Sequence, residues 1–169
     1  RVYYSGYVPV LTDNRLPSPG TLVPMMRENR LYQADWLLRF YGFRVHELFT
    51  DVIHDLDHEV DPKTAWALRN LHLFPLDINS APREMLLRIP GIGQKSVAKI
   101  LMARKHQRLS FDHLQHFGFA VNRARHFFSC NGNMPLKSHD PATLKSILLG
   151  TSHSKYLKTF SPQLSLFNP

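Results

Sequence analysis

Residues 85–98 read MLLRIPGIGQKSVA, and their glycines allow the backbone N–H groups of this segment to bind an anion. Gly91 and Gly93 permit backbone conformations that other residues resist, and they leave no side chain between the backbone and an incoming phosphate. The N–H groups at the start of the following helix face such an anion, and the helix dipole favours its charge. Lys95 adds a charge-assisted contact and Ser96 a hydroxyl donor. The segment therefore predicts a phosphate site; the alternative is an ordinary turn that contains glycines.

Two helices must position this turn. The first is predicted to open at Asn79 or Ser80 and to run through Met85–Leu87, before Pro90 ends it. The second is predicted from Gln94 to about Lys105. Its apolar face is expected at Val97, Ile100 and Leu101.

The positive charge of the chain is concentrated around this turn. The net charge is +8, and residues 81–126 alone carry nine Lys and Arg against two Asp and Glu, a net +7. A local basic segment is the electrostatic footprint of a polyanionic partner, and the alternative is a solvated basic face that binds nothing. The residues predicted to form a DNA-binding surface are Arg88, Gly91, Ile92, Gly93, Gln94, Lys95, Ser96, Lys99, Arg104, Arg123 and Arg125.

A sequence motif indicates that the polyanionic partner is DNA. The pattern Leu–x–x–Ile–Pro–Gly–Ile–Gly–x–x–x–Val–Ala at 86–98 resembles the helix-hairpin-helix of DNA-binding proteins, with Ile92 as a wedge between the two helices. A second, degenerate hairpin follows around 114–124, with Ala120 in place of the second glycine. Together Asp77–Phe128 resemble the paired helix-hairpin-helix domain of competence proteins and repair nucleases. That resemblance implies binding to the minor-groove backbone with little sequence preference.

Four stretches together resemble one narrower family. They are YYSGYVPV (3–10), RLYQADWLLRFYGF (30–43), DPKTAWALR (61–69) and PLDINSAPREMLLRIPGIG (75–93). The family is the radical SAM proteins of DNA modification and repair, bacterial proteins linked to a uracil-DNA-glycosylase-like partner. The resemblance implies a cytoplasmic, nucleoid-associated parent enzyme whose barrel binds an iron–sulfur cluster through three cysteines, together with S-adenosylmethionine. This chain matches only the closing part, and its lone Cys130 cannot replace the cluster motif, so no cofactor and no catalytic residue is assigned to it.

The expected fold is mainly α: a paired helix-hairpin-helix domain preceded by a single orphan strand and a helical connector. The strand is Val2–Val10, which fits the last strand of a missing barrel. The expected division is 1–25 as barrel strand and loop, 26–74 as connector, 75–130 as the DNA-binding domain, and 131–169 as a flexible tail. Helices are predicted over 28–41, over 61–70 with Asp61 as cap, over 111–117, over 122–128 and, weakly, over 144–149.

Composition excludes several classes of protein. With 43% hydrophobic and 11% aromatic residues, the chain can form a packed core. No apolar run reaches the roughly 18 residues that a membrane helix needs, so no membrane partner is expected. A single cysteine excludes a disulfide framework within the chain. No signal peptide opens the sequence, and the start at Arg1 suggests a fragment or a processed chain.

Three other functional hypotheses compete with DNA binding alone. His54 and His58 lie four residues apart beside acidic residues, the spacing of a shared metal on a helix, but a solvated polar face explains them as well and no metal is assigned. Lys95 and Asp112 have the spacing of a helix-hairpin-helix glycosylase, in which a lysine attacks a sugar carbon. The last hypothesis is a purely structural helical module that binds a protein.

The end of the chain carries a docking motif. The pentapeptide Gln163, Leu164, Ser165, Leu166 and Phe167 resembles the peptide with which bacterial polymerases and repair proteins bind the β sliding clamp. Leu166 and Phe167 would enter a hydrophobic pocket while Gln163 hydrogen-bonds at its rim. The alternative is a tail that folds back on its own domain. Deletion of 163–167 is expected to abolish clamp binding in a pulldown.

Overall fold

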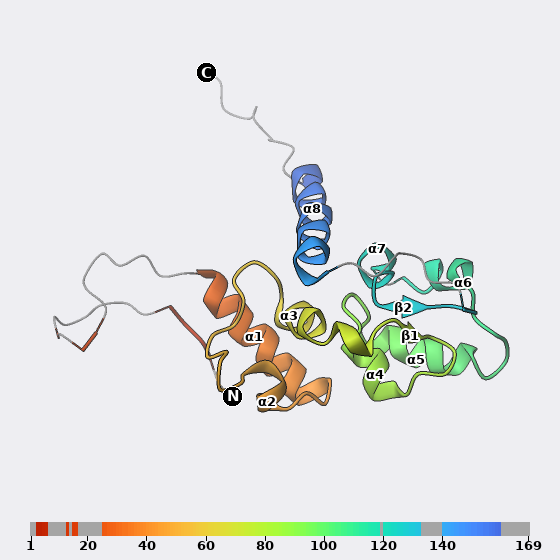
Figure 1. Ribbon diagram of the computed structural model, residues 1–169, viewed down its shortest axis with the longest axis horizontal. Helices are drawn as coiled ribbons and strands as arrows, with labels where there is room; N and C mark the ends of the chain where they lie inside the picture. The colour runs from red at the N-terminus through yellow and green to blue at the C-terminus, as the bar shows by residue number, and fades with distance from the viewer. Residues whose placement is uncertain are drawn as a thin grey trace, which may run out of the picture. The chain divides into compact units, whose positions relative to one another are not determined.

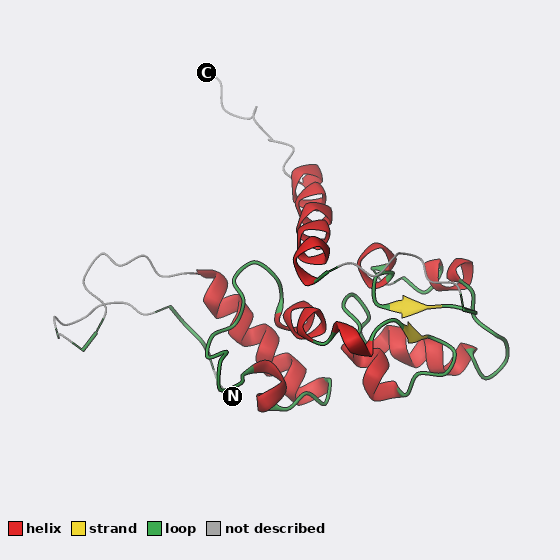
Figure 2. Ribbon diagram, in the orientation of Figure 1, coloured by secondary structure: helices red, strands yellow, loops and turns green. Residues whose placement is uncertain are grey.

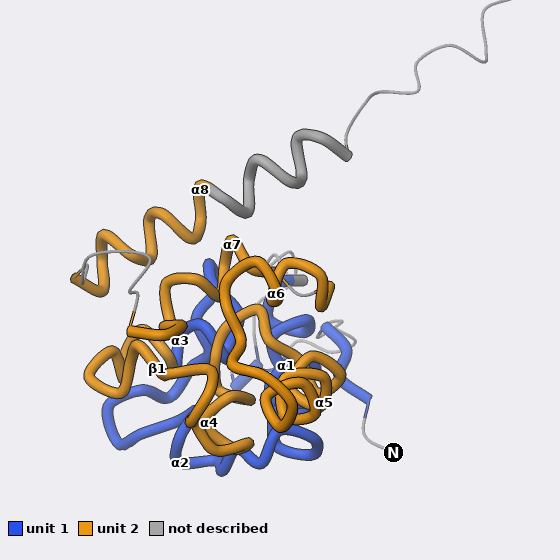
Figure 3. Tube along the Cα trace, turned by 90° about the vertical axis from the view of Figure 1, so that its right-hand side faces the viewer, with its two compact units in different colours: residues 1–66 blue, residues 67–169 orange. Residues whose placement is uncertain are grey.

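The computed structural model describes residues 3–6, 13, 15–16, 25–118, 120–132 and 140–159. Within these ranges the chain is mainly helical, as expected, with eight α-helices, one short 3₁₀ helix and two short strands (Figures 1 and 2). It divides into two compact units, 1–66 and 67–169 (Figure 3). The boundary falls inside α3 (Pro62–Arg69), whereas the sequence placed the start of the second domain at residue 75.

Unit 1 is built on α1 (Met25–Phe40), α2 (Val45–Leu48) and the first residues of α3. α1 begins three residues before the predicted start at 28, and Gly42, at φ +69°, follows its end. The core includes the edge-to-face rings of Phe43 and Trp66, whose centroids are 5.6 Å apart. Pro62 opens α3, and Asp61 Oδ1 accepts the backbone N–H of Thr64 at 3.0 Å, which confirms the predicted cap.

A buried arginine holds the acidic loop of unit 1. Arg30 on α1 is 7% exposed, and its guanidinium donates to the backbone oxygens of Asp57, His58 and Glu59, each at 3.1 Å. A charge inside a protein needs such acceptors. The backbone of the loop is therefore fixed from within.

Unit 2 contains two helix pairs flanked by a small parallel sheet. The 3₁₀ helix Leu71–Leu73 and strand β1 (Leu76–Asp77) lead into the pairs. The elements that follow are α4 (Arg83–Arg88), α5 (Gln94–Ala103), α6 (Phe111–Gln115), α7 (Val121–Ala124), β2 (Phe128–Ser129) and α8 (Pro141–Thr159).

The sheet joins the two ends of the helical segment. Leu76 pairs with Phe128 in parallel, Leu76 N–H donates to Phe127 O at 3.0 Å, and Ile78 N–H donates to Ser129 O at 3.0 Å. The sequence analysis missed these strands because two residues carry no period-two pattern. Among the described residues they form the only sheet.

The core of unit 2 lies beneath the helix pairs. Its described side chains that are under 2% exposed are Ile78, Leu86, Leu87, Ile89, Ile92, Val97, Ile100, Leu109, Leu114, Phe127, Phe128 and Leu148, together with Ala67 and Ala124. Val97 and Ile100 confirm the apolar face predicted for α5, while Leu101 is only partly buried. Each such side chain contributes about 1.5–3 kcal/mol to folding.

The expected N-terminal strand does not form in the part of it that the structure describes. Tyr3–Gly6 have no strand pairing; instead the Tyr4 ring meets the Tyr32 ring edge-on, and Tyr4 N–H donates to the Tyr32 hydroxyl at 3.0 Å. Tyr4, at least, therefore packs on α1 and not in a sheet. Val2 and residues 7–10 lie outside the described residues.

Three predicted helices have other boundaries in the structure. α4 begins at Arg83, because the side chains of Asp77 and Asn79 bond to other backbone groups and leave 78–80 as a turn. α7 ends at Ala124, short of the predicted 128, because Phe128 pairs with Leu76 in the sheet. α8 runs to Thr159, through residues that the sequence assigned to a tail. Asp140 starts it by accepting the N–H groups of Ala142 and Thr143, both at 3.0 Å. Among the described residues, no helix has both the length and the apolar character needed to cross a membrane.

Candidate nucleic-acid interface

The turn between α4 and α5 carries the predicted anion site. Gly91 adopts φ +85°, a left-handed conformation that disfavours any side chain. Ile92 is 1% exposed, as expected of a wedge between the helices. Gly93 is the N-cap of α5 with φ −104° and ψ 175°, an extended conformation open to any residue. The two glycines therefore differ, and only Gly91 is required by its backbone.

Gly91 also faces the second helix pair. A Cβ placed on it would stand 3.0 Å from the backbone oxygen of Ala120 and 3.3 Å from the Ala120 Cβ. A methyl group at this position would therefore fit only if Ala120 moved away. The sequence analysis assigned this missing side chain to phosphate access, whereas the structure shows that Ala120 occupies the space.

The second turn matches the first in one essential feature. Gly118, between α6 and α7, adopts φ +74°, close to the angle at Gly91. Lys99 on α5 reaches it, and Lys99 Nζ donates to the Phe117 backbone oxygen at 3.1 Å. Phe119 lies outside the described residues. The two turns thus lie side by side, joined by the Gly91–Ala120 approach and by this hydrogen bond.

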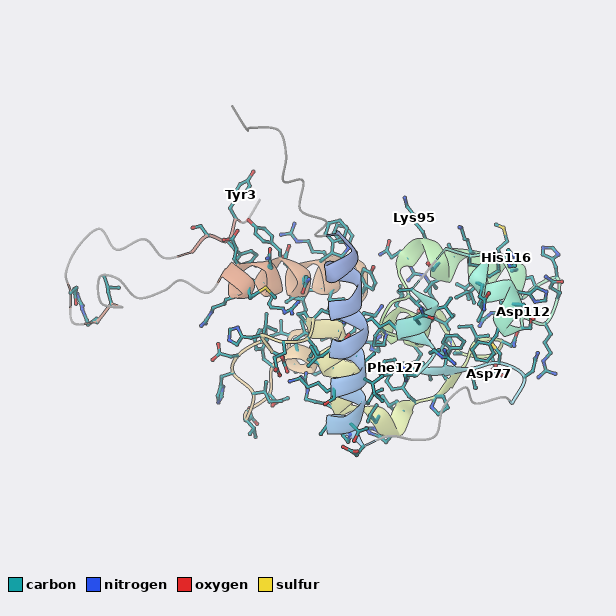
Figure 4. All side chains as sticks on the ribbon, turned by 90° about the horizontal axis from the view of Figure 1, so that it is seen from above. Tyr3, Asp77, Lys95, Asp112, His116 and Phe127 are labelled. Carbon is teal, nitrogen blue, oxygen red and sulfur yellow. The ribbon has the colours of Figure 1, made fainter. Side chains whose placement is uncertain are left out.

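The N-terminus of α5 has the features of an anion-binding site. The first N–H groups of a helix have no acceptor inside it, and Gly93 has no side chain to accept from them. Gln94 and Lys95 are exposed and Ser96 is partly buried. Figure 4 shows Lys95 projecting outward from the start of α5. Positive charge, helix dipole and donors therefore coincide at one exposed point.

Two of the predicted DNA-binding arginines are engaged within the protein. Arg104 lies at the other end of α5, where its guanidinium donates to Ala81 O at 2.7 Å and Ile78 O at 3.4 Å. Arg88 donates to Glu84 O at 3.0 Å within α4. Both side chains are partly buried. Basic residue type alone could not separate such internal donors from surface charges.

The remaining predicted arginines lie on or beside α7. Arg125 follows α7 and is exposed, whereas Arg123 within α7 is partly buried. The structure therefore brings Lys95, Lys99 and Arg125 to the surface of the paired turns and the helices that flank them.

The two units differ in the balance of their charges. The pairs Arg15–Asp13, Arg27–Asp55 and Arg39–Asp35, at 2.7, 3.1 and 2.9 Å, all lie in unit 1. Unit 2 carries 14 Lys and Arg against four Asp and Glu, a net +10. Its exposed cations that make no ion pair within the described part of the chain include Arg83, Lys95, Lys105, Arg108 and Arg125. Of these, the sequence analysis missed Arg83, Lys105 and Arg108.

The glycosylase geometry does not assemble in this structure. Lys95 is exposed at the start of α5, while Asp112 is exposed on α6, and Figure 4 shows the two side chains apart. An amine nucleophile of this type needs a sheltered, low-dielectric site. Lys95 therefore serves better as an anion contact than as a nucleophile.

The structure gives no support to a metal site at His54 and His58, and it does not describe the clamp-binding pentapeptide. His54 and His58 lie in the loop after α2, off any helix, and among the described residues no three His, Cys, Asp or Glu gather closely enough to hold a metal. The clamp pentapeptide 163–167 lies outside the described residues. A scan against protein-family models found no match, and comparisons with curated proteins and with solved structures found none.

Proposed function

We propose that unit 2 binds DNA without sequence preference, as a paired helix-hairpin-helix domain. The observation that carries the proposal is the α4–α5 turn, in which the glycine-capped start of α5 and the exposed Lys95 face outward together. The neighbouring α6–α7 turn supports it, because a paired domain needs two such turns side by side.

The phosphate backbone is the feature of DNA that this surface recognises. Backbone N–H groups at the start of α5 donate to a phosphate oxygen, and Lys95 adds a charge-assisted contact. These groups contact no base edge, so the binding energy is independent of sequence. Lys99 and Arg125 add to the positive field. Because cations on the protein replace condensed counterions, salt weakens the binding steeply.

The place of this domain in a larger enzyme is part of the proposal. The four stretches at 3–10, 30–43, 61–69 and 75–93 support a parent radical SAM protein that modifies or repairs DNA. That family binds its iron–sulfur cluster through three cysteines. This chain has one, Cys130, which is 2% exposed. The residues present do not fit the cluster, so the contribution of this chain is to hold DNA. The uracil-DNA-glycosylase-like partner and the sliding clamp remain predictions.

Fluorescence anisotropy with a labelled duplex across a salt series tests the proposal. Lys95→Gln removes one phosphate contact, so affinity is expected to fall about eightfold at 0.1 M salt and the slope of log K against log salt to decrease by about 0.9. Arg27→Gln is the matched control, because it removes an exposed cation that Asp55 already pairs. Duplexes of unrelated sequence should bind equally. A folded wild-type protein that binds no duplex would contradict the proposal and favour a structural module.

A further inference from the structure

The loop that follows α5 forms a second basic surface. Residues 104–108 read Arg-Lys-His-Gln-Arg, and Lys105, His106, Gln107 and Arg108 are all exposed. The loop lies at the end of α5 opposite the Gly91–Gly93 turn (Figure 1). Of its residues, the sequence analysis singled out only Arg104.

This loop is anchored at both ends by polar side chains. On one side, Arg104 donates to Ala81 O at 2.7 Å. On the other, Asn79 bonds both backbone groups of Leu109, accepting its N–H at 2.8 Å and donating to its oxygen at 3.1 Å. Leu109 itself is fully buried. The intervening cations are therefore presented on a fixed backbone, which lowers the entropy cost of binding.

Within the chain these cations are not neutralised. Residues 85–111 contain six Lys and Arg and no Asp or Glu. Lys105 and Arg108 make neither an ion pair nor a side-chain hydrogen bond within the described part of the chain. Like charges held together at a surface cost energy unless an anion approaches. A polyanion is the ligand chemistry that this loop fits.

We infer that the 104–108 loop is a second phosphate-binding site, which contacts the same DNA as the α4–α5 turn. The inference rests on the proposed function. The ten residues of α5 span about 15 Å and separate the two sites. Phosphates follow one another about every 3.4 Å along each DNA strand, so two sites this far apart contact different phosphates of one duplex. Lys95 makes its contact at one end of α5, and Lys105 with Arg108 at the other.

The test is the salt dependence of duplex binding by the full chain carrying Lys105→Gln and Arg108→Gln together. Loss of two contacts is expected to lower the slope of log K against log salt by about 1.8 and affinity about 60-fold at 0.1 M salt. The matched control carries Arg27→Gln and Arg39→Gln, which remove the same charge from exposed, ion-paired positions in unit 1. Thermal unfolding of both variants checks that the fold is retained.

The outcomes separate the inference from the proposed function. If Lys95→Gln weakens binding while the Lys105/Arg108 variant behaves like its control, the second site is overturned and the first stands. If the wild-type chain binds no duplex, the proposed function fails before the loop is tested. Slopes that fall by about 0.9 for Lys95→Gln and about 1.8 for the double variant establish both sites.

Discussion

A Cβ on Gly91 would stand 3.0 Å from the backbone oxygen of Ala120, so any side chain in the first turn of unit 2 would press on the second turn. The chain separates these two residues by two helices, yet their backbones are in contact. The geometry of the α4–α5 turn therefore depends on the position of the α6–α7 turn. A change in either turn is therefore expected to alter the proposed anion site.

Gly91→Ala is expected to destabilise unit 2 more than Gly118→Ala. Both glycines have positive φ, so each substitution costs about 1–2 kcal/mol of backbone strain. Only at Gly91 does the new methyl group also meet Ala120, which adds about 1–3 kcal/mol of overpacking, whereas at Gly118 nothing lies within 4 Å. Urea unfolding of the two variants measures the difference. Equal losses of stability would show that the turns do not touch in solution.

Arg104→Gln is expected to reduce stability without changing the salt dependence of DNA binding. The substitution removes partly buried hydrogen bonds to Ala81 O and Ile78 O, at a cost of about 1–3 kcal/mol. Lys105→Gln, one residue away and exposed, is expected to show the opposite behaviour: unchanged stability and a smaller salt slope. Urea unfolding and anisotropy on the same samples compare the two. A smaller slope for Arg104→Gln would make it a phosphate contact after all.

Cys130 is expected to be unreactive in the folded protein. Burial, and to a lesser extent the nearby Asp77 carboxylate, raise the pKa of its thiol to about 12. The thiolate is the reactive form, so a thiol reagent at pH 8 should label the chain only as fast as it unfolds. Rapid labelling without denaturant would contradict the burial.

The raised pKa of Cys130 also predicts that the stability of the protein depends on pH. In the folded protein the pKa of Cys130 lies above the ordinary value of 9.0, so the protonated thiol contributes its full stability below pH 9.0. As the pH rises from 9.0 towards 12, the thiol ionises more readily in the unfolded chain, and the folded protein loses this stability. The wild type should therefore lose stability relative to Cys130→Ala above pH 9. Urea midpoints of both proteins at pH 7.5 and pH 10.5 isolate the thiol from other titrating groups.

Asp140→Ala is expected to shorten α8 from its N-terminus. The Asp140 side chain accepts hydrogen bonds from the side chain and the backbone of Thr143, which lower its pKa below the ordinary 3.8. The cap is therefore present above that pH and is lost as pH falls through the lowered value. Backbone chemical shifts over 141–149 should lose helical character in the variant, and in the wild type as the pH falls well below 3.8. Asp51→Ala, an exposed acid in unit 1, is the control.

Local patterns predicted the elements whose causes are local. Asp61 and Pro62 begin α3 as their residue types indicate, and the spacing of Val97 and Ile100 located the buried face of α5. The turn at Gly91 was found from its glycine and proline. In each case the deciding interactions lie within one or two helical turns, where residue type and spacing are informative.

The features that sequence reasoning missed come from contacts between distant residues. Asn79 was predicted to start a helix, but it bonds the backbone of Leu109, 30 residues away. Arg104 was counted as a surface charge, but its acceptor is Ala81. Tertiary partners decided both outcomes. The extension of α8 to Thr159 was also missed, because residues 131–169 were assigned to a flexible tail.

The pairing of Leu76 with Phe128 has a consequence for the course of the chain. The chain enters the helix pairs beside the place where it leaves them, because adjacent strands lie about 4.8 Å apart. The helical segment is therefore a loop closed by its own sheet, in which backbone hydrogen bonds hold its first residues against its last.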